Sequence, residues 1–586
     1  MRGTVLVILG VLACVTARHL RAEDEALPPG LLIGAGVSAC QAEGAWNLSG
    51  KAESVLDKVA HSNKVFPANV DVAADHYHRY KEDLAYAKEM HFNSHRFSIS
   101  WSRVLPTGDA NNPSMEGVSF YHEYIKEIKA AGMEPMVTMS HFDHPFTLEE
   151  SSKGWTNAAM ISKFEEYANF LFKTYGSEVK YWTTINEPNM FCNYFTTILF
   201  KAGLAPNADN DIYRCLHHIT LAHLRVYRLY KDLYYKTQQG LVGCSAMLWP
   251  TVPATTNSED MEAAEAFIEM YTGTVLHPLI YGEYPPVTRY LVDKRSKELG
   301  LPESRLPHFT QEEKAQLEEQ PTDFIALNVY SGFKASYKLN DSDGDAKPKM
   351  LGPISYDMPF LKLTGVSDFG GDVDRLTHDA ILRVWDSYHK PIVIAENGFG
   401  DTLGLGINDD LRAAYHSASL RSLIRSMNEY GINVLGYYVW ALLDVFEFSA
   451  GYSGRPFGLV HVDYESGSLK RTLKESSKFF IKLGETGKVP YVAPPEQSTE
   501  PAPSTALPST PTALPSTPTA PSSTPTAQST ATSLPSTTTQ PPSTSASTRG
   551  PTTSEKPPST TPSSSSCASV SSLVLTILAS SSVLRR

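Results

Sequence analysis

The stretch that decides the fold is Val179-Lys180-Tyr181-Trp182-Thr183-Thr184-Ile185-Asn186-Glu187-Pro188. Its β-branched and aromatic residues predict a short buried strand that runs to Ile185. Pro188 ends the strand because proline cannot donate a backbone hydrogen bond to a neighbouring strand. The sequence therefore places an amide, Asn186, and a carboxylate, Glu187, side by side at the carboxyl end of a buried strand.

A second stretch, Ile392-Val393-Ile394-Ala395-Glu396-Asn397-Gly398, is built in the same way. An isolated Asn-Glu-Pro is more often an ordinary polar turn after a strand. Two buried strands that each deliver a glutamate at the carboxyl end are instead what a two-carboxylate glycosidase on a parallel barrel requires. Glu187 and Glu396 are therefore the candidate catalytic pair.

Strand-like apolar runs alternate with helical patterns along most of the chain. The predicted strands are 32–38, 93–99, 134–139, 181–185, 241–248, 323–327, 392–395 and 434–439. Apolar residues at helical spacing lie between them, most clearly in 77–90, 120–131, 160–175 and 412–430. A strand followed by a helix, repeated about eight times, predicts an α/β fold, a closed (β/α)8 TIM barrel over residues 18–490.

Polar and aromatic residues gather at the carboxyl ends of these strands. They are Gln41, Glu43, Arg96, His141, Asp143, Asn186, Glu187, Asn328, Tyr330, Glu396, Asn397, Trp440, Asp444 and Glu447. Each alone could be a satisfied core residue. Together, at one end of a barrel, they predict a shared pocket.

The composition excludes some classes of partner. The 586 residues carry a formal net charge of −12 and no basic cluster, which argues against nucleic acid as a partner. Hydrophobic residues make up 41% of the chain and aromatic residues 10%, which is enough for a large core. The sequence does not define the oligomeric state.

The N-terminus has the features of a secretory signal, with Arg2, an apolar run over 4–12 and small residues at 15–17. The apolar run is about half of the ~20 residues that a transmembrane helix needs. The acceptor sequons at Asn47 and Asn340 fit glycosylation on the same route. We therefore expect a signal peptide at 1–17 and passage through the secretory pathway.

Four of the six cysteines fall within the predicted barrel, at Cys40, Cys192, Cys215 and Cys244. Their spacing fits no zinc site, so we expect either a disulfide or buried thiols. Cys192 and Cys215 flank one loop, which favours that pair. Cys244 lies in an apolar strand and is expected to be a buried thiol.

From about residue 491 the chain consists almost wholly of proline, serine, threonine and alanine. Such a segment cannot bury enough apolar surface to form a core, so 491–566 is expected to be an extended, O-glycosylated, mucin-like stalk. Small residues at 563–566 precede an apolar run at 573–579, which are the ingredients of a GPI-attachment signal over 567–586. We expect a cell-surface, membrane-anchored protein, with a secreted extracellular protein as the alternative.

These motifs resemble those of glycoside hydrolase family 1, the β-glucosidase family, between about residues 28 and 488. The matching segments are 41–46 (QAEGAW), 96–103 (RFSISWSR), 141–143 (HFD), 184–188 (TINEP), 328–330 (NVY), 394–398 (IAENG) and 440–452. They look like those of animal members, including insect β-glucosidases, myrosinase-like enzymes and relatives of lactase. The resemblance implies a (β/α)8 barrel that hydrolyses β-linked sugars with retention, without metal or cofactor.

By the same resemblance, Glu187 is the general acid and base, and Glu396 is the nucleophile that forms a glycosyl-enzyme. Retention requires the two carboxyls to stand ~5 Å apart, and the charge of Glu396 should raise the pKa of Glu187. The residues implied to support the nucleophile are Arg96, Asn328 and Tyr330. Those implied to bind the sugar are Gln41, His141, Asn186, Tyr330, Trp440, Glu447 and Phe448.

Four positions depart from the family pattern. Phe142 and Phe448 stand where tryptophan is usual, Cys40 replaces a common tyrosine, and His144 replaces a common leucine. Phenylalanine keeps the ring but lacks the indole N–H, so a hydrogen bond to a sugar hydroxyl worth ~1 kcal/mol is expected to be lost. We therefore expect weaker activity on glucosides or a shifted specificity.

Two other functions remain open. A non-catalytic carbohydrate-binding or receptor protein on the same barrel typically lacks a catalytic glutamate, whereas both are present here. A specialised thioglucosidase or transglycosidase is also compatible with the sequence, because animal thioglucosidases keep the acid glutamate.

Overall fold

The computed structural model describes residues 25–204, 212–338, 354–366 and 371–493. The expected signal peptide and GPI signal, and all but the first three residues of the expected stalk, lie outside the described residues. Of the two sequons, Asn340 also lies outside them, whereas Asn47 is exposed on a loop.

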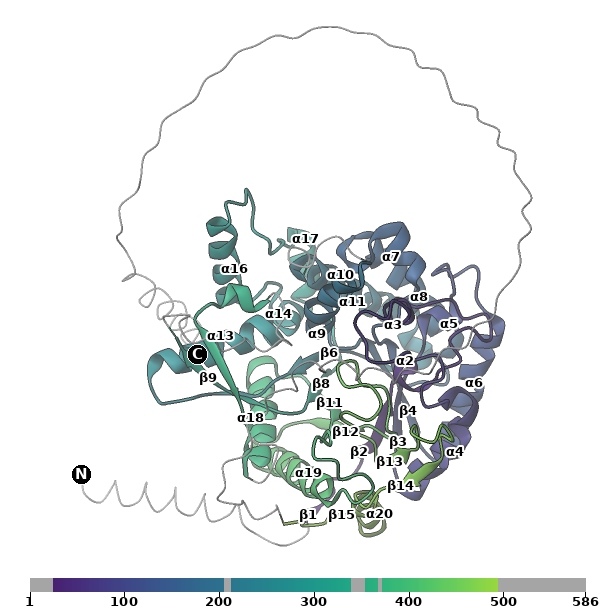
Figure 1. Ribbon diagram of the computed structural model, residues 1–586. Helices are drawn as coiled ribbons and strands as arrows, with labels where there is room; N and C mark the ends of the chain where they lie inside the picture. Colours follow the sequence, from purple (N-terminus) through teal and green to yellow (C-terminus); the bar gives the residue numbers. More distant parts are fainter. Residues whose placement is uncertain (1–24, 205–211, 339–353, 367–370, 494–586) are drawn as a thin grey trace, which may run out of the picture. The chain divides into compact units, whose positions relative to one another are not determined.

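Eight parallel strands close into a barrel (Figure 1). In barrel order they are β2 Leu32–Val37, β3 Ser94–Ser98, β4 Glu134–Ser140, β5 Tyr181–Ile185, β6 Leu241–Leu248, β8 Ile325–Val329, β11 Ile392–Asn397 and β12 Val434–Trp440. The last strand, β12, pairs in parallel with β2 and closes the barrel. The predicted fold is confirmed, with strand ends that differ from the predicted ones by at most two residues.

Helices cover the outside of the barrel. The longer ones are α4 His76–Glu89, α6 Met115–Ala130, α8 Ala159–Tyr175, α11 Ile212–Leu233, α13 Ser258–Ile268, α16 Pro286–Glu298, α18 Gly371–Tyr388, α19 Asp410–Tyr430 and α20 Ser477–Thr486. The shorter ones are α2 Ala39–Ala42, α3 Val55–His61, α5 Trp101–Val104, α7 Phe146–Ser152, α9 Pro188–Met190, α10 Thr196–Ala202, α12 Tyr235–Gln238, α14 Thr274–Leu276, α15 Pro278–Tyr281 and α17 Gln311–Leu317, with η1 Gly154–Thr156, η2 Phe191–Phe195 and η3 Glu269–Gly273.

Short strands pair outside the barrel in three small sheets. These are β1 Glu25–Ala26 with β15 Lys488–Val489, β7 Thr251–Pro253 with β9 Phe333–Tyr337 and β10 Leu361–Gly365, and β13 Val460–Val462 with β14 Arg471–Leu473. The first of them ties the beginning of the described chain to its end.

The helices follow from the apolar spacing of the sequence. In α8 the residues Met160, Phe164 and Leu171 are fully or almost fully buried and form one stripe against the barrel. Helix α6 begins five residues earlier than predicted because Ser114 caps it, accepting a hydrogen bond from the Gly117 N–H at 3.2 Å.

Apolar side chains fill the barrel at the amino ends of its strands. Met136, Phe324 and Tyr438 form a buried cluster there, and Leu32 and Leu241, the first residues of β2 and β6, pack against it. These side chains fill the amino end of the barrel, which leaves the carboxyl ends of the strands as the usual place for a ligand site in this fold.

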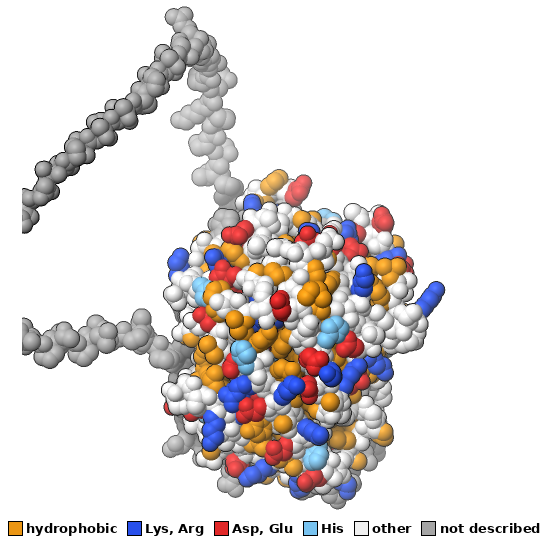
Figure 2. All heavy atoms as spheres, turned by 90° about the vertical axis from the view of Figure 1, so that its right-hand side faces the viewer, with side chains coloured by type: hydrophobic (Ala, Val, Ile, Leu, Met, Phe, Trp, Pro, Cys, Tyr) orange, Lys and Arg blue, Asp and Glu red, His pale blue; other side chains and the backbone are white. Residues whose placement is uncertain are grey.

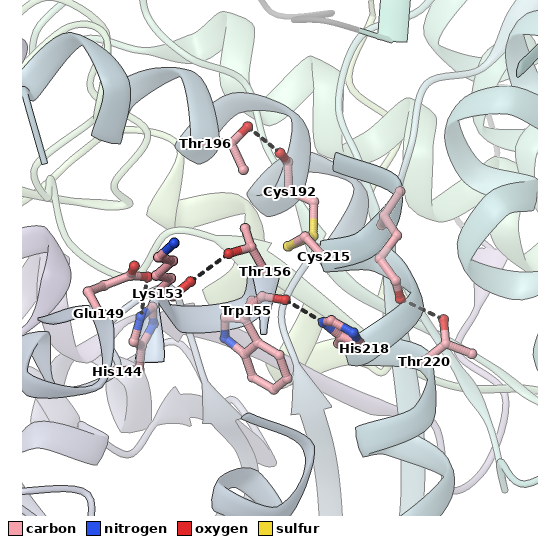
Figure 3. Close-up of a disulfide and its surroundings, with 11 residues drawn as sticks. His144, Glu149, Lys153, Trp155, Thr156, Cys192, Thr196, Cys215, His218 and Thr220 are labelled. Atoms are coloured by element: carbon pink, nitrogen blue, oxygen red, sulfur yellow. Dashed lines mark hydrogen bonds and ion pairs between the residues drawn. A yellow bond between two sulfur atoms is a disulfide. The ribbon is translucent and has the colours of Figure 1, made fainter. Parts of the chain in front are cut away.

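A disulfide joins Cys192 in η2 to Cys215 in α11, as the sequence favoured (Figure 3). Cys244 is a buried free thiol, as expected, and Cys40 is a partly buried one. The bond ties the long helix α11 to η2, which follows Glu187 after the short helix α9.

Charged side chains of both signs are interspersed with apolar ones on the face shown in Figure 2. Such mixing is ordinary for a solvent-facing surface. Within the described ranges, none of the helices has the length and apolar character needed to cross a membrane.

Candidate active site

A cavity of about 340 Å³ lies at the carboxyl ends of the barrel strands, which is within the size range of small-molecule sites. The predicted residues that line it are Gln41, His141, Asn186, Glu187, Tyr330, Glu396, Trp440, Glu447 and Phe448. Arg96 and Asn328 lie behind this lining, in β3 and β8, and reach it through hydrogen bonds. The fold thus brings the residues predicted from separate strands into one cavity.

Glu396 lies near the end of β11 and accepts hydrogen bonds on both carboxylate oxygens. Arg96 Nη1 donates to Oε1 at 2.6 Å, and the Tyr330 hydroxyl donates to Oε2 at 2.5 Å. Arg96 thereby sets a permanent positive charge against this carboxylate. Burial, and next the charge of Glu396, raise the pKa of Tyr330 well above its ordinary value, so the phenol keeps the proton that it donates.

Glu187 directly follows β5 and has a left-handed backbone conformation, with φ of 39°. Such a conformation is uncommon for a residue other than glycine and often marks a functional position. Its Oε1 accepts a hydrogen bond from Asn328 Nδ2 at 2.7 Å. Burial is the largest cause that raises the pKa of Glu187, and the charge of Glu396 raises it further. The predicted direction is confirmed, but burial is the main cause.

Asn186 links the two carboxyl groups. Its Oδ1 accepts hydrogen bonds from Arg96 Nη2 at 2.8 Å and from Asn328 Nδ2 at 3.1 Å. Asn328, which the sequence placed beside Glu396 as a support, donates its amide N–H groups to Glu187 and Asn186. A continuous chain of hydrogen bonds therefore runs from Glu187 through both amides and Arg96 to Glu396.

Further polar groups of the cavity are held in fixed orientations. Trp440 Nε1 donates to Glu447 Oε1 at 3.1 Å, and Gln41 Nε2 donates to the Phe446 carbonyl at 2.7 Å. The rings of His141 and Trp440 are nearly parallel, with centroids 6.0 Å apart. Burial raises the pKa of Glu447 to about 8 and lowers the pKa of His141 well below its ordinary value. Both groups are thus favoured in their neutral forms near neutral pH.

Three acidic residues of the predicted cluster lie outside the cavity lining. Glu43 pairs with Arg103 at 3.0 Å, and Asp444 pairs with Lys474 at 2.6 Å. Asp143 is buried and accepts a hydrogen bond from the His141 N–H at 3.3 Å, and burial raises its pKa to about 7. None of the three belongs to the cavity lining. Their position after barrel strands was therefore not enough to make them site residues.

Phe142 and Phe448, which stand at the positions expected to hold tryptophan, lie on one side of the cavity with ring centroids 6.0 Å apart. Phe195 packs on them at 4.8 and 5.3 Å, respectively, and Phe66 packs on Phe448 at 5.8 Å. The two substitutions therefore belong to one cluster of phenylalanine rings that carries no hydrogen-bonding group.

The sequence did not predict the part of the cavity that the loops build. Its residues, which we call the apolar wall, are Met190, Tyr194, Phe195, Trp249 and Phe333. Trp249 and Phe333 stack at 4.7 Å with 14° between the ring planes. Trp249 directly follows the strand β6. Its place after a barrel strand could therefore have identified it from the sequence, as it did for the other strand-end residues. The rest of the wall comes from α9, η2 and β9, whose courses the sequence does not define.

The comparison with protein families decides the assignment, because the model of glycosyl hydrolase family 1 matches residues 23–489. The chain belongs to glycosyl hydrolase family 1. This family membership makes the chain a glycoside hydrolase whose substrate is a β-glycoside, in agreement with the resemblance of its motifs.

This family 1 chain is similar to other proteins over most of their length. It is 35% identical over 471 residues to Myrosinase 1 of Brevicoryne brassicae, which covers 79% of this chain and 100% of that protein. It is 35% identical over 486 residues to furcatin hydrolase of Viburnum furcatum, with 78% and 86% covered.

Solved structures of the family also match the barrel. The aphid myrosinase structure has a TM-score of 0.72 and 32% identity, with 79% of this chain and 100% of that chain covered. A mutant rice β-glucosidase in a covalent complex with Glc has a TM-score of 0.70 and 29% identity, with 78% and 98% covered.

Proposed function

We propose that this family 1 enzyme is a retaining β-glycosidase in which Glu187 is the general acid and base and Glu396 is the nucleophile. The observation that carries the proposal is the contrast between the two carboxyl groups. Arg96 and Tyr330 hold both oxygens of Glu396, whereas Glu187 is buried, bonded to the Asn328 amide, and has a raised pKa. Two neighbouring carboxyls in opposite environments suit one acid and one nucleophile.

The first step forms the glycosyl-enzyme. Glu396 attacks the anomeric carbon while Glu187 gives its proton to the leaving oxygen, so the glycosidic bond breaks as the bond to Glu396 forms. In the second step, the Glu187 carboxylate takes a proton from water, which attacks the anomeric carbon and releases Glu396. Two inversions leave the configuration of the sugar unchanged.

The remaining polar residues bind the sugar in this proposal. Arg96 and Asn328 fix the Asn186 amide, which is thereby placed to reach the 2-hydroxyl, where a hydrogen bond strengthens in the transition state. The other hydroxyls are bound by Gln41, His141 and Glu447, and Trp440 provides a stacking surface. Their existing hydrogen bonds reduce the reorganisation that substrate binding requires.

The substrates are β-glucosides or related β-glycosides with an apolar or aromatic aglycone. The apolar wall supports this choice, because the stacked rings of Trp249 and Phe333 offer a flat surface for such a group. Binding energy gained on the aglycone can be expressed in the rate. It can therefore compensate for the hydrogen bonds to the sugar that Phe142 and Phe448 cannot donate.

Proton NMR of the first product formed from an aryl β-glucoside tests the proposal. We expect the β-anomer to appear first and to convert slowly to the equilibrium mixture. Initial appearance of the α-anomer would overturn the role of Glu396 as nucleophile.

We further propose that the enzyme acts at the cell surface, carried by the signal at 1–17 and held through the stalk 491–566 and the GPI signal at 567–586. The exposed sequon at Asn47 and the Cys192–Cys215 disulfide support a secretory route. Phosphatidylinositol-specific phospholipase C should release activity from intact expressing cells. Activity found only in the medium before treatment would contradict the anchor.

A further inference from the structure

Arg455 lines the active-site cavity, and its guanidinium forms no hydrogen bond or ion pair with any group in the described part of the chain. Its Nε is buried without a partner. The guanidinium carbon stands 5.4 Å from the centroid of the Phe457 ring. The residue as a whole is half-buried and lines the cavity. Because an unpaired buried donor costs free energy, a cavity ligand that pairs with the guanidinium would gain from the contact.

Arg455 packs against Gly400, which has no side chain, and against the ring of Phe457. A Cβ on Gly400, in the loop after β11, would lie 2.5 Å from Arg455 Nε and 2.6 Å from the Phe457 ring. Phe457 packs edge-on against Tyr330 at 5.6 Å, and Tyr330 donates to Glu396. The position of Arg455 is therefore tied to the packing around the nucleophile.

Glu447, an acidic residue of the same cavity, does not neutralise Arg455. Its charge acts on Glu447 and lowers the pKa of that carboxyl, but burial has the larger effect and raises this pKa to about 8. The two side chains form no ion pair among the described residues, and below that pKa Glu447 is a neutral acid. A positive charge is thus left without a counter-charge on the side of the cavity that binds the sugar.

We propose that Arg455 binds an anionic group on the glycoside, and that the enzyme accepts acidic β-glycosides, of which β-glucuronides are the simplest. This inference rests on the proposed glycosidase function. A guanidinium presents paired N–H donors that match the oxygens of a carboxylate or sulfate group, and such charge-assisted bonds are stronger than neutral ones. A neutral glucoside leaves the guanidinium unpaired, which is a basis for discrimination.

The test compares kcat/KM on 4-nitrophenyl β-glucuronide with kcat/KM on 4-nitrophenyl β-glucoside at mildly acidic pH. Arg455→Gln should lower the glucuronide-to-glucoside ratio by about tenfold or more, because a charge-assisted contact is lost. Arg455→Lys should lower it less, since lysine keeps the charge but not the paired donors. A 6-sulfated β-glucoside is tested in parallel. If its kcat/KM relative to the glucoside exceeds that of the glucuronide, sulfate is the preferred anion.

Lys334→Gln is the matched control. Lys334 is an exposed cation next to Phe333 of the apolar wall, so its replacement removes the same charge without touching the cavity, and the ratio should not change. An equal fall of the glucuronide-to-glucoside ratio in both variants would mean that the positive charge attracts the anionic substrate over a long range. That result would overturn a direct contact with Arg455.

Inhibition by glucuronic acid and by glucose gives a readout that does not depend on turnover. Arg455→Gln should weaken inhibition by the acid more than inhibition by glucose, and equal weakening would overturn the inference. A wild type that hydrolyses glucosides but neither anionic substrate would also overturn it. A wild type that hydrolyses no β-glycoside would instead overturn the proposed function.

Discussion

Two regions of one cavity are built in different ways. The polar floor, by which we mean Arg96, Asn186, Glu187, Asn328 and Glu396, lies on barrel strands or directly at their ends, and hydrogen bonds join its members. The apolar wall lies on short helices, an outer strand and a loop, and its members meet by ring packing. The barrel strands thus position the proposed catalytic residues, whereas the loops position the apolar wall that we propose binds the aglycone.

The largest expected effect comes from the floor. Glu396→Gln should lower kcat/KM by ~10⁴-fold or more on every substrate, because no other group can form the covalent intermediate. Thermal unfolding should show a folded protein. Substantial turnover by this variant, after contamination is excluded, would remove Glu396 from the role of nucleophile.

Replacement of the acid should depend on the leaving group. Glu187→Gln should lower kcat/KM by ~10³-fold for an aryl glucoside with a poor leaving group, but by less than about tenfold for dinitrophenyl glucoside, whose phenolate leaves without a proton. The comparison uses kcat/KM because this constant reports the first step. Equal losses on both substrates would contradict the acid role.

The pH dependence follows from the same residue. Glu187 must be protonated to act as the acid, and burial with the charge of Glu396 raises its pKa. We therefore expect kcat/KM to be retained at neutral pH and to fall as the pH rises through that raised pKa. The basic limb should vanish in Glu187→Gln assayed on dinitrophenyl glucoside. A basic limb that persists in this variant would assign it to another group.

Removal of the disulfide tests whether the apolar wall can be altered without altering the polar floor. Replacing Cys192 and Cys215 by serine opens a crosslink with a sequence separation of 23 residues, for which chain entropy gives a loss of about 3 kcal/mol in the free energy of unfolding. Because η2 also carries Tyr194 and Phe195, KM for bulky apolar aglycones should rise more than KM for small ones. Denaturant unfolding and a set of aglycones measure both effects.

The free thiol Cys244 provides the control for that experiment. Cys244→Ala removes a buried sulfur of β6 away from η2, so it should cost less stability and should not change the preference among aglycones. If the loss of the disulfide instead lowered kcat equally on all substrates, the change in the apolar wall would have reached the polar floor. The two regions would then not act independently.

The smallest effect concerns the missing indole. Phe448→Trp should raise kcat/KM on a small aryl glucoside by about fivefold, because one hydrogen bond of ~1 kcal/mol becomes available to a sugar hydroxyl. Phe448→Tyr, which adds a hydroxyl elsewhere on the ring, is the comparison variant. If the tryptophan variant gains nothing and the wild type is already fast on small glucosides, the phenylalanine cluster has compensated in another way.

The sequence predicted the floor well, because strand ends can be recognised where apolar runs stop at polar residues. It could not predict that Asn328 bonds Glu187, since this contact depends on side-chain reach across the barrel. It also could not rank burial above the charge of Glu396 for the pKa of Glu187, because burial comes from residues far apart in the chain. The apolar wall could not be predicted from the sequence for the same reason, because its loops gain their positions only from tertiary packing.

The central claim is that Glu396 forms a covalent bond to the sugar. Incubation with a 2-deoxy-2-fluoro-β-glucoside bearing a good leaving group should trap this intermediate, and peptide mass spectrometry should locate it. We predict one added fluoroglucosyl group on the peptide that contains Glu396, and none in Glu396→Gln. A label on another residue, or no label on an enzyme that still hydrolyses glucosides, would contradict the account.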